Sequence, residues 1–264
     1  MLSLRDGRNG MNDPFEGSRR KLARGEYHLE ILKRDIDAFF KENPYERVIE
    51  PNPELPGYVD WKIRISKPVP EHLAETIGDV ATNLRAALDH AVYAFAIAGG
   101  RTKPREAYFP ISGSADAFEP NMKGRCRDVP QEIYPILRMF KPYKGGNDLL
   151  WALNEVCLRD KHILLMPICN GAVVNKGKVV CNPADVRFPA DATWHRGNNE
   201  IVFFSAKAEA QLYYDLKVTA FIAFDEIEVI RGKPVCGFFD SAARAVEIAI
   251  AAIEGRARAV GFIK

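Results

Sequence analysis

Residues 71–98 read EHLAETIGDVATNLRAALDHAVYAFAIA, and they are the most informative stretch of the sequence. Its apolar residues recur every three or four positions, which is the spacing of one face of an α-helix. That face holds Ile77, Ala81, Leu84, Leu88, Ala91 and Phe95. Gly99-Gly100 follows directly, as is common after the C-terminus of a helix. We therefore expect a long helix with one apolar face and one wide polar face.

The residues before this helix predict a second long helix and a β-hairpin. A stripe of apolar residues indicates a helix from about Phe15 to Phe40, which Asn43-Pro44 ends because a residue before proline leaves the helical region. Apolar and charged residues then alternate over Val59–Ile65, as in a half-buried strand. Its expected hairpin partner is Arg47–Glu50.

The residues after this helix predict further helices and then a sheet. Residues 101–128 indicate a long loop with one short helix, followed by helices at about Gln131–Phe140 and Asn147–His162. From about Leu164 the apolar period changes to two. The expected strands are Ile163–Cys169, Lys178–Cys181, Ile201–Ala206, Leu216–Phe224 and Glu226–Ile230, with a final helix at Phe238–Ala259.

This order predicts an α+β fold: an N-terminal helical bundle with an inserted β-hairpin, then a C-terminal antiparallel sheet and a closing helix. We expect a flexible N-terminus at 1–14 and a helical domain at 15–163. A β-rich region would cover 164–264, with its final helix packed back on the bundle.

Composition narrows the classes of function. The 264 residues include 37 Lys and Arg against 35 Asp and Glu, so the net charge of +2 excludes a basic coat but allows a local basic patch. The five cysteines lack a Cys-x-x-Cys spacing and no His-x-x-x-His occurs, so we expect no metal and no cofactor. Without a signal peptide or a membrane-spanning apolar run, a cytoplasmic protein is expected.

The polar face of the central helix carries the candidate chemistry, on Asn83, Arg85, Asp89 and His90. Arg85 and Asp89 are one helical turn apart and can pair. Histidine titrates near neutrality and can transfer protons, and the planar guanidinium of arginine matches phosphate oxygens. These residues could serve a phosphate-transfer site, or they could form a polar network between helices.

The string Asn83-Leu84-Arg85-Ala86-Ala87-Leu88-Asp89-His90 resembles the Arg-x4–6-His motif of the HEPN superfamily, many of whose members are metal-independent ribonucleases. The chain is also similar to uncharacterised bacterial and phage proteins that share Phe109-Pro110-Ile111 and Asp160-Lys161-His162. The resemblance implies cleavage of single-stranded RNA by attack of the 2′-hydroxyl, in phage defence or in a toxin system with an antitoxin or other protein partner. His90 would be the base or acid, Arg85 the phosphate clamp, and Asn83 or Asp89 would orient them.

Residues five apart on a helix lie about 140° apart, so one helix does not bring Arg85 and His90 to the same atom. HEPN-type nucleases solve this by forming a composite site across a two-fold axis, and the resemblance therefore implies a homodimer.

Two further groups are candidates for binding substrate. Lys161 and His162 end a predicted helix, where they could bind phosphate or simply cap the helix. Arg125 and Arg127 belong to the segment 101–145, which carries a net charge of +4 with interleaved aromatic residues. Such a loop could bind single-stranded RNA or could be a solvated face over buried rings.

Three hypotheses remain open from the sequence: a HEPN-type endoribonuclease, a non-catalytic module that binds RNA or a nucleotide, and a structural protein whose sheet binds a partner.

Overall fold

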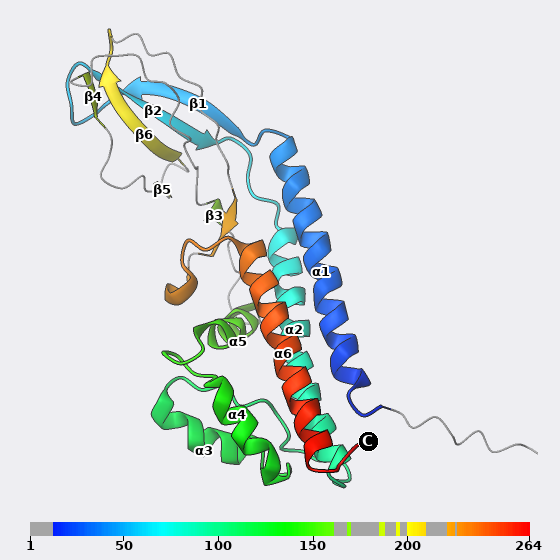
Figure 1. Ribbon diagram of the computed structural model, residues 1–264. Helices are drawn as coiled ribbons and strands as arrows, with labels where there is room; N and C mark the ends of the chain where they lie inside the picture. Colours follow the sequence, from blue (N-terminus) through cyan, green and yellow to red (C-terminus); the bar gives the residue numbers. More distant parts are fainter. Residues whose placement is uncertain are drawn as a thin grey trace, which may run out of the picture. The chain divides into compact units, whose positions relative to one another are not determined.

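The computed structural model describes residues 13–160, 168–169, 185–187, 194–195, 200–209, 221–224 and 226–264 (Figure 1). These residues form an α+β fold, as the sequence predicts. Nearly all of the expected flexible N-terminus lies outside the described residues. The strand expected at Lys178–Cys181 lies outside them as well.

The expected long helices are confirmed. Helix α1 spans Glu16–Lys41 and helix α2 spans His72–Ala98. The predicted apolar stripe of α1 is buried along its length, at Leu22, Leu29, Leu32, Ile36 and Phe39, and so is every residue on the predicted apolar face of α2. Gly100 has a positive φ of 85°, and the Arg101 amide donates to the Ala96 carbonyl, which closes the helix in the expected way.

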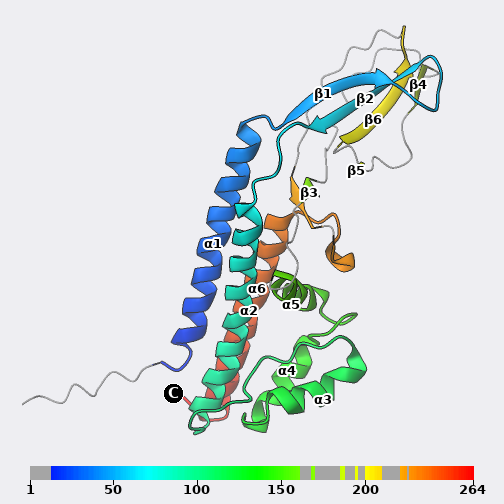
Figure 2. The ribbon, with the colours of Figure 1, turned by 180° about the vertical axis from the view of Figure 1, so that it is seen from behind.

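The middle of the chain forms short helices, and a long helix lies near its C-terminus. The short ones are α3 (Ala115–Arg125), the 3-10 turn Gln131–Ile133, α4 (Tyr134–Phe140) and α5 (Asp148–Asp160). The closing helix α6 spans Val235–Ala259. Residues 78–98 of α2 and the later part of α6 run side by side in both views (Figure 1 and Figure 2).

The hairpin and a later strand belong to one antiparallel sheet. Strands β1 (Tyr45–Pro51) and β2 (Tyr58–Ile65) form the hairpin, and β2 also pairs with β6 (Glu200–Lys207). The short strands β4 (Val186–Arg187) and β5 (Trp194–His195) pair with the other edge of β6. Strands β3 (Ile168–Cys169) and β7 (Ile222–Ala223) form a separate antiparallel pair.

One expected strand is wrong. Residues Glu228–Ile230 form a 3-10 turn instead of part of a strand at Glu226–Ile230. Ile227 and Ile230 are both buried there, and a separation of three residues brings side chains to one side of a 3-10 turn. The apolar pattern that suggested a strand therefore comes from two isoleucines whose side chains bury a tight turn.

The chain divides into two compact units. The helical unit comprises residues 1–28, 78–161 and 239–264, and the sheet unit comprises residues 29–77 and 162–238. The boundaries expected at 14/15 and 163/164 stay a prediction. Among the described residues, no helix is both long enough and apolar enough to cross a membrane.

Candidate functional site in the helical unit

Arg85, the arginine of the Arg-x4-His motif, is enclosed in the helical unit. Its side chain is only 10% exposed. Nη1 donates to the Asp89 carboxylate at 2.5 Å, and Nε donates to the Asn154 side-chain oxygen on α5 at 3.1 Å. Nη2 donates to the Phe109 carbonyl at 3.0 Å. All three guanidinium nitrogens therefore have acceptors within the protein.

The ion pair of Arg85 and Asp89 also forms hydrogen bonds with the main chain of Phe109. The Phe109 amide donates to Asp89 Oδ1 at 2.9 Å, while its carbonyl accepts from Arg85. We call this arrangement of Arg85, Asp89 and Phe109 the clamp. The predicted pairing of Arg85 with Asp89 is confirmed, and the clamp joins the motif to the segment Phe109-Pro110-Ile111, whose residues are all buried.

His90 and Asn83 lie on a different side of α2, toward α1. A Cβ placed on Gly17 of α1 would lie 3.1 Å from His90 Nδ1. Lys21 Nζ is 3.5 Å from the Asn83 side-chain oxygen. The His90 side chain is exposed, so this seam between the two helices is accessible to solvent.

The structure therefore separates the two halves of the motif within one chain. Arg85 faces α5 and Phe109, whereas His90 faces the start of α1, in agreement with the angle of about 140° between them. Asp89 lies with Arg85, and Asn83 lies on the seam with His90. Lys161 and His162 lie outside the described residues.

Arg125 and Arg127 lie on a second exposed feature of the helical unit. Residues 105–108 and 125–128 are joined by main-chain hydrogen bonds: the Tyr108 amide donates to the Arg125 carbonyl at 3.0 Å, and the Asp128 amide donates to the Glu106 carbonyl at 3.1 Å. Exposed side chains lie along and beside these segments. We call them the arginine surface, which consists of Arg101, Arg105, Tyr108, Arg125 and Arg127.

One of the two acidic residues of this region, Asp128, is bonded to the main chain through its carboxylate. The Asp128 carboxylate accepts from the amides of Glu106 and Arg105. These main-chain hydrogen bonds, with smaller contributions from Arg127 and Arg101, hold the pKa of Asp128 below its usual range. Asp128 therefore stays ionised near neutrality, and the four arginines outnumber the two acids, Glu106 and Asp128.

Sequence reasoning missed Asn154 and the main chain of Phe109 as partners of Arg85. The spacing of Arg85 and Asp89 indicates their pairing, but nothing in the sequence indicates which distant groups complete the set. Tyr108 was visible only as one of several interleaved aromatic residues.

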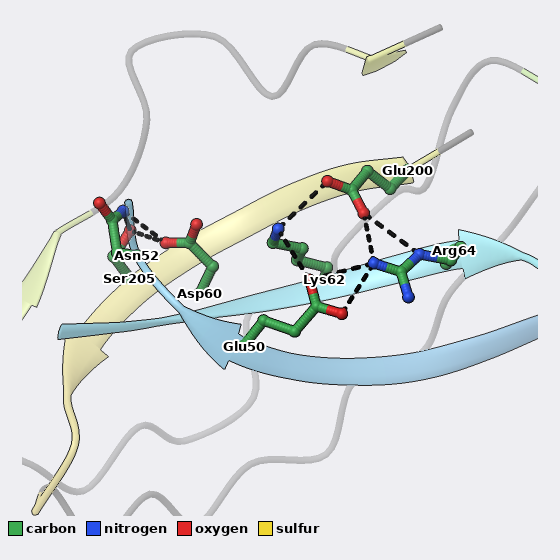
Figure 3. Close-up of polar contacts among 7 residues, drawn as sticks. All are labelled: Glu50, Asn52, Asp60, Lys62, Arg64, Glu200 and Ser205. Atoms are coloured by element: carbon green, nitrogen blue, oxygen red, sulfur yellow. Dashed lines mark hydrogen bonds and ion pairs between the residues drawn. The ribbon is translucent and has the colours of Figure 1, made fainter. Parts of the chain in front are cut away.

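The sheet unit carries a separate polar cluster on one face of its sheet (Figure 3). Lys62 and Arg64 on β2 each bind both Glu50 and Glu200, and Glu200 is almost fully buried. On the same strands, Asp60 accepts from Asn52 at 2.6 Å and from Ser205 at 2.7 Å. Each charged side chain labelled in Figure 3 contacts a side chain of opposite charge or a hydrogen-bond donor. We therefore interpret the cluster as structural.

An irregularity in the sheet brings these groups together. The register between β2 and β6 shifts after Trp61, so that Trp61 pairs with Phe204 but Lys62 pairs with Val202. The extra residue places Ser205 on the same face as Glu200, although an odd separation would otherwise put them on opposite faces. Strict alternation in the sequence therefore cannot reveal the cluster.

The sheet unit also contains a shallow groove of about 460 Å³ beside Phe39 and Pro68. Among the residues that line it, Lys67 forms an ion pair with Glu42 at 3.0 Å, and His72 Nε2 lies 3.7 Å from the Asp35 carboxylate. Within the described ranges, no group of three or more His, Cys, Asp or Glu side chains is placed to hold a metal ion.

Comparison of the chain with protein-family models, curated proteins and solved structures found no match.

Proposed function

We propose that the helical unit is a non-catalytic, HEPN-like module that binds single-stranded RNA at the arginine surface. The observation that carries this proposal is that the arginine of the motif is buried while other arginines of the same unit are exposed. Arg85 of the motif is enclosed with three protein acceptors, whereas the four arginines of the arginine surface are exposed.

The physical basis is the charge of the nucleic-acid backbone. Arginine binds phosphate oxygens through paired N–H groups and remains charged at every physiological pH. Each phosphate that a protein neutralises releases counterions, which favours binding at low salt. A local set of exposed arginines can thus bind RNA even though the whole chain is nearly neutral.

On this proposal the Arg-x4-His motif on α2 does not touch RNA; its Arg85 instead helps to position a segment that does. Arg85 and Asp89 fix the main chain of Phe109, which follows Tyr108 directly. The clamp would thereby set the place of one of the two segments that carry the arginine surface. Such a role needs a buried and fully bonded arginine, which is what the helical unit contains.

The test is the affinity for a short fluorescein-labelled single-stranded RNA across a range of salt concentrations, in EDTA. We expect binding that weakens steeply as salt rises. The double variant Arg125→Ala/Arg127→Ala should bind more weakly. It should also reduce the slope of log K against log salt by about 0.7 for each phosphate that the protein no longer neutralises.

The matched control is Arg34→Ala/Arg244→Ala, which removes the same charge from exposed positions elsewhere. Equal losses in both double variants would show a general charge effect and would contradict a site at the arginine surface.

A second candidate function, the metal-independent endoribonuclease, is favoured by one observation. His90 is exposed on the seam with α1, beside Gly17 and two helical turns after Asn83, where a substrate could reach it. A composite site in a homodimer would also require Arg85, which is enclosed. The same RNA, incubated in EDTA and examined for 2′,3′-cyclic phosphate ends, separates the two functions: cleavage by the wild type that His90→Ala abolishes would favour the enzyme.

A further inference from the structure

Tyr108 combines a fixed main chain with an exposed ring. Its amide donates to the Arg125 carbonyl at 3.0 Å, and its carbonyl accepts from the Cys126 thiol at 3.3 Å. The next residue, Phe109, is held on both its amide and its carbonyl by the clamp. Two consecutive residues therefore have all their main-chain polar groups bonded.

The hydrogen bond from the Cys126 thiol to the Tyr108 carbonyl is present near neutral pH. Burial, with the nearby Asp89 charge acting in the same direction, raises the pKa of the Cys126 thiol to about 12. The thiol thus keeps its proton and remains a donor to the Tyr108 carbonyl.

Tyr108 is 42% exposed, although both of its neighbours in the chain, Ala107 and Phe109, are buried. Within the described part of the chain, the ring has no aromatic partner and the hydroxyl has no hydrogen bond. A flat ring presented on a rigid main chain can stack on a ligand at little further cost in conformational entropy.

We propose that Tyr108 stacks on an unpaired base and makes the arginine surface selective for single-stranded over double-stranded RNA. This inference rests on the proposed function and adds the residue that distinguishes the two substrates. Arg125, whose main chain adjoins that of Tyr108, is exposed, and its Nε donates to the Asn121 side-chain oxygen at 3.2 Å; on this proposal its terminal nitrogens bind a phosphate next to the stacked base.

The selectivity follows from the accessibility of bases. Within a duplex, each base face except the outer faces of the two terminal pairs is covered by its neighbours, so that a protein ring has almost no face to stack on, and phosphates and sugars remain for the arginines. In a single strand the bases can splay apart, and stacking on an aromatic side chain is worth roughly a 5- to 100-fold change in affinity for each base.

The experiment measures the affinity of the full-length chain for a short single-stranded RNA and for the blunt duplex of the same sequence. We expect the wild type to prefer the single strand. Tyr108→Ala should weaken single-strand binding by roughly 5- to 100-fold and leave duplex binding nearly unchanged. Tyr108→Phe should keep the preference, whereas Tyr108→Leu, which retains apolar bulk without a π-face, should lose it.

Tyr93 on α2 provides the matched control, because its exposed fraction is also 42% and it lies one turn after His90. Tyr93→Ala should bind like the wild type. Salt-sensitive binding that Tyr108→Ala and Tyr108→Leu leave intact would overturn this inference while the proposed function stands. A wild type that binds neither RNA would overturn both, and a loss in Tyr93→Ala alone would place the RNA on the seam instead.

Discussion

Arg85 has partners in three parts of the helical unit: Asp89 on α2, Asn154 on α5 and the main chain at Phe109. Removal of one member of such a buried set leaves the others without their hydrogen bonds. The free energy of that loss usually exceeds the net value of the bonds themselves, because the remaining polar groups stay out of water.

We therefore expect Arg85→Ala to lower the free energy of unfolding by roughly 2–4 kcal/mol. His90→Ala, at an exposed position five residues later, should change it by less than about 0.5 kcal/mol. Urea denaturation followed by circular dichroism measures both. A variant Arg85→Ala as stable as the wild type would contradict the structural role of the clamp.

Cys126 allows a second test at the scale of residues. Its thiol is buried and has a raised pKa of about 12, so little thiolate is present to react at mildly alkaline pH. We expect iodoacetamide to modify Cys126 only after unfolding, whereas the half-buried Cys236 should react in the folded protein. Peptide mass spectrometry gives the extent at each site, and rapid labelling of Cys126 under native conditions would contradict the packing around Tyr108.

At the scale of elements, α1 and α2 approach closely at Gly25. A Cβ on Gly25 would lie 2.8 Å from Leu84 Cδ2 and 3.4 Å from the Leu84 amide nitrogen. Leu84 is completely buried, so it has little room to move away. The glycine lets the two helices approach within the helical unit.

Gly25→Ala should therefore destabilise the protein by about 1–3 kcal/mol from overpacking, even though alanine favours helices more than glycine does. Gly255 in α6 is the control, because a Cβ there would meet nothing within 4 Å. Gly255→Ala should stabilise by up to about 1 kcal/mol. Thermal unfolding of both variants reports the difference, and changes of the same sign would contradict the close approach.

Elements with a long, regular pattern were predictable from the sequence. The stripes of α1 and α2 extend over many turns, and each turn repeats the same signal. Short strands such as β4 carry only two residues, and their pairing with β6 is decided by contacts far away in the sequence. Ile227 and Ile230 gave a wrong prediction because a buried 3-10 turn and a strand can share the same short apolar pattern.

The candidate site was predictable only in its local part. A separation of four residues on a helix is enough to predict the ion pair of Arg85 with Asp89. The acceptor at Phe109 is a main-chain group, and main-chain groups have no signature in a sequence. The exposure of Arg125 and Arg127, in contrast to the enclosure of Arg85, depends on tertiary packing as well.

At the scale of the whole molecule, ionised carboxylates should set the response to acid. Hydrogen bonds lower the pKa of three carboxyl groups. Glu50 accepts from Arg64, and Glu119 accepts from Arg138. Asp128 accepts from the Glu106 amide. Since these pKa values are lower in the folded than in the unfolded chain, the unfolded chain binds more protons in acid.

The stabilising contribution of these groups is thus complete above about pH 5 and is lost as the pH falls below about 4. We expect the melting temperature to decrease across this range, and Glu119→Gln to make the decrease smaller. Glu26→Gln, at an exposed position on α1, is the control. A Glu119→Gln profile parallel to that of the wild type would contradict the lowered pKa.

The charge of the molecule is near zero overall, but the arginine surface concentrates positive charge in the helical unit. This local concentration is what the proposed binding of RNA depends on. The most direct measurement is ultraviolet cross-linking of single-stranded RNA to the full-length protein, with the attached nucleotides located by peptide mass spectrometry. We predict cross-links within residues 101–128, with Tyr108 the main site. Cross-links confined to the seam around His90, or to the sheet unit, would contradict RNA binding at the arginine surface.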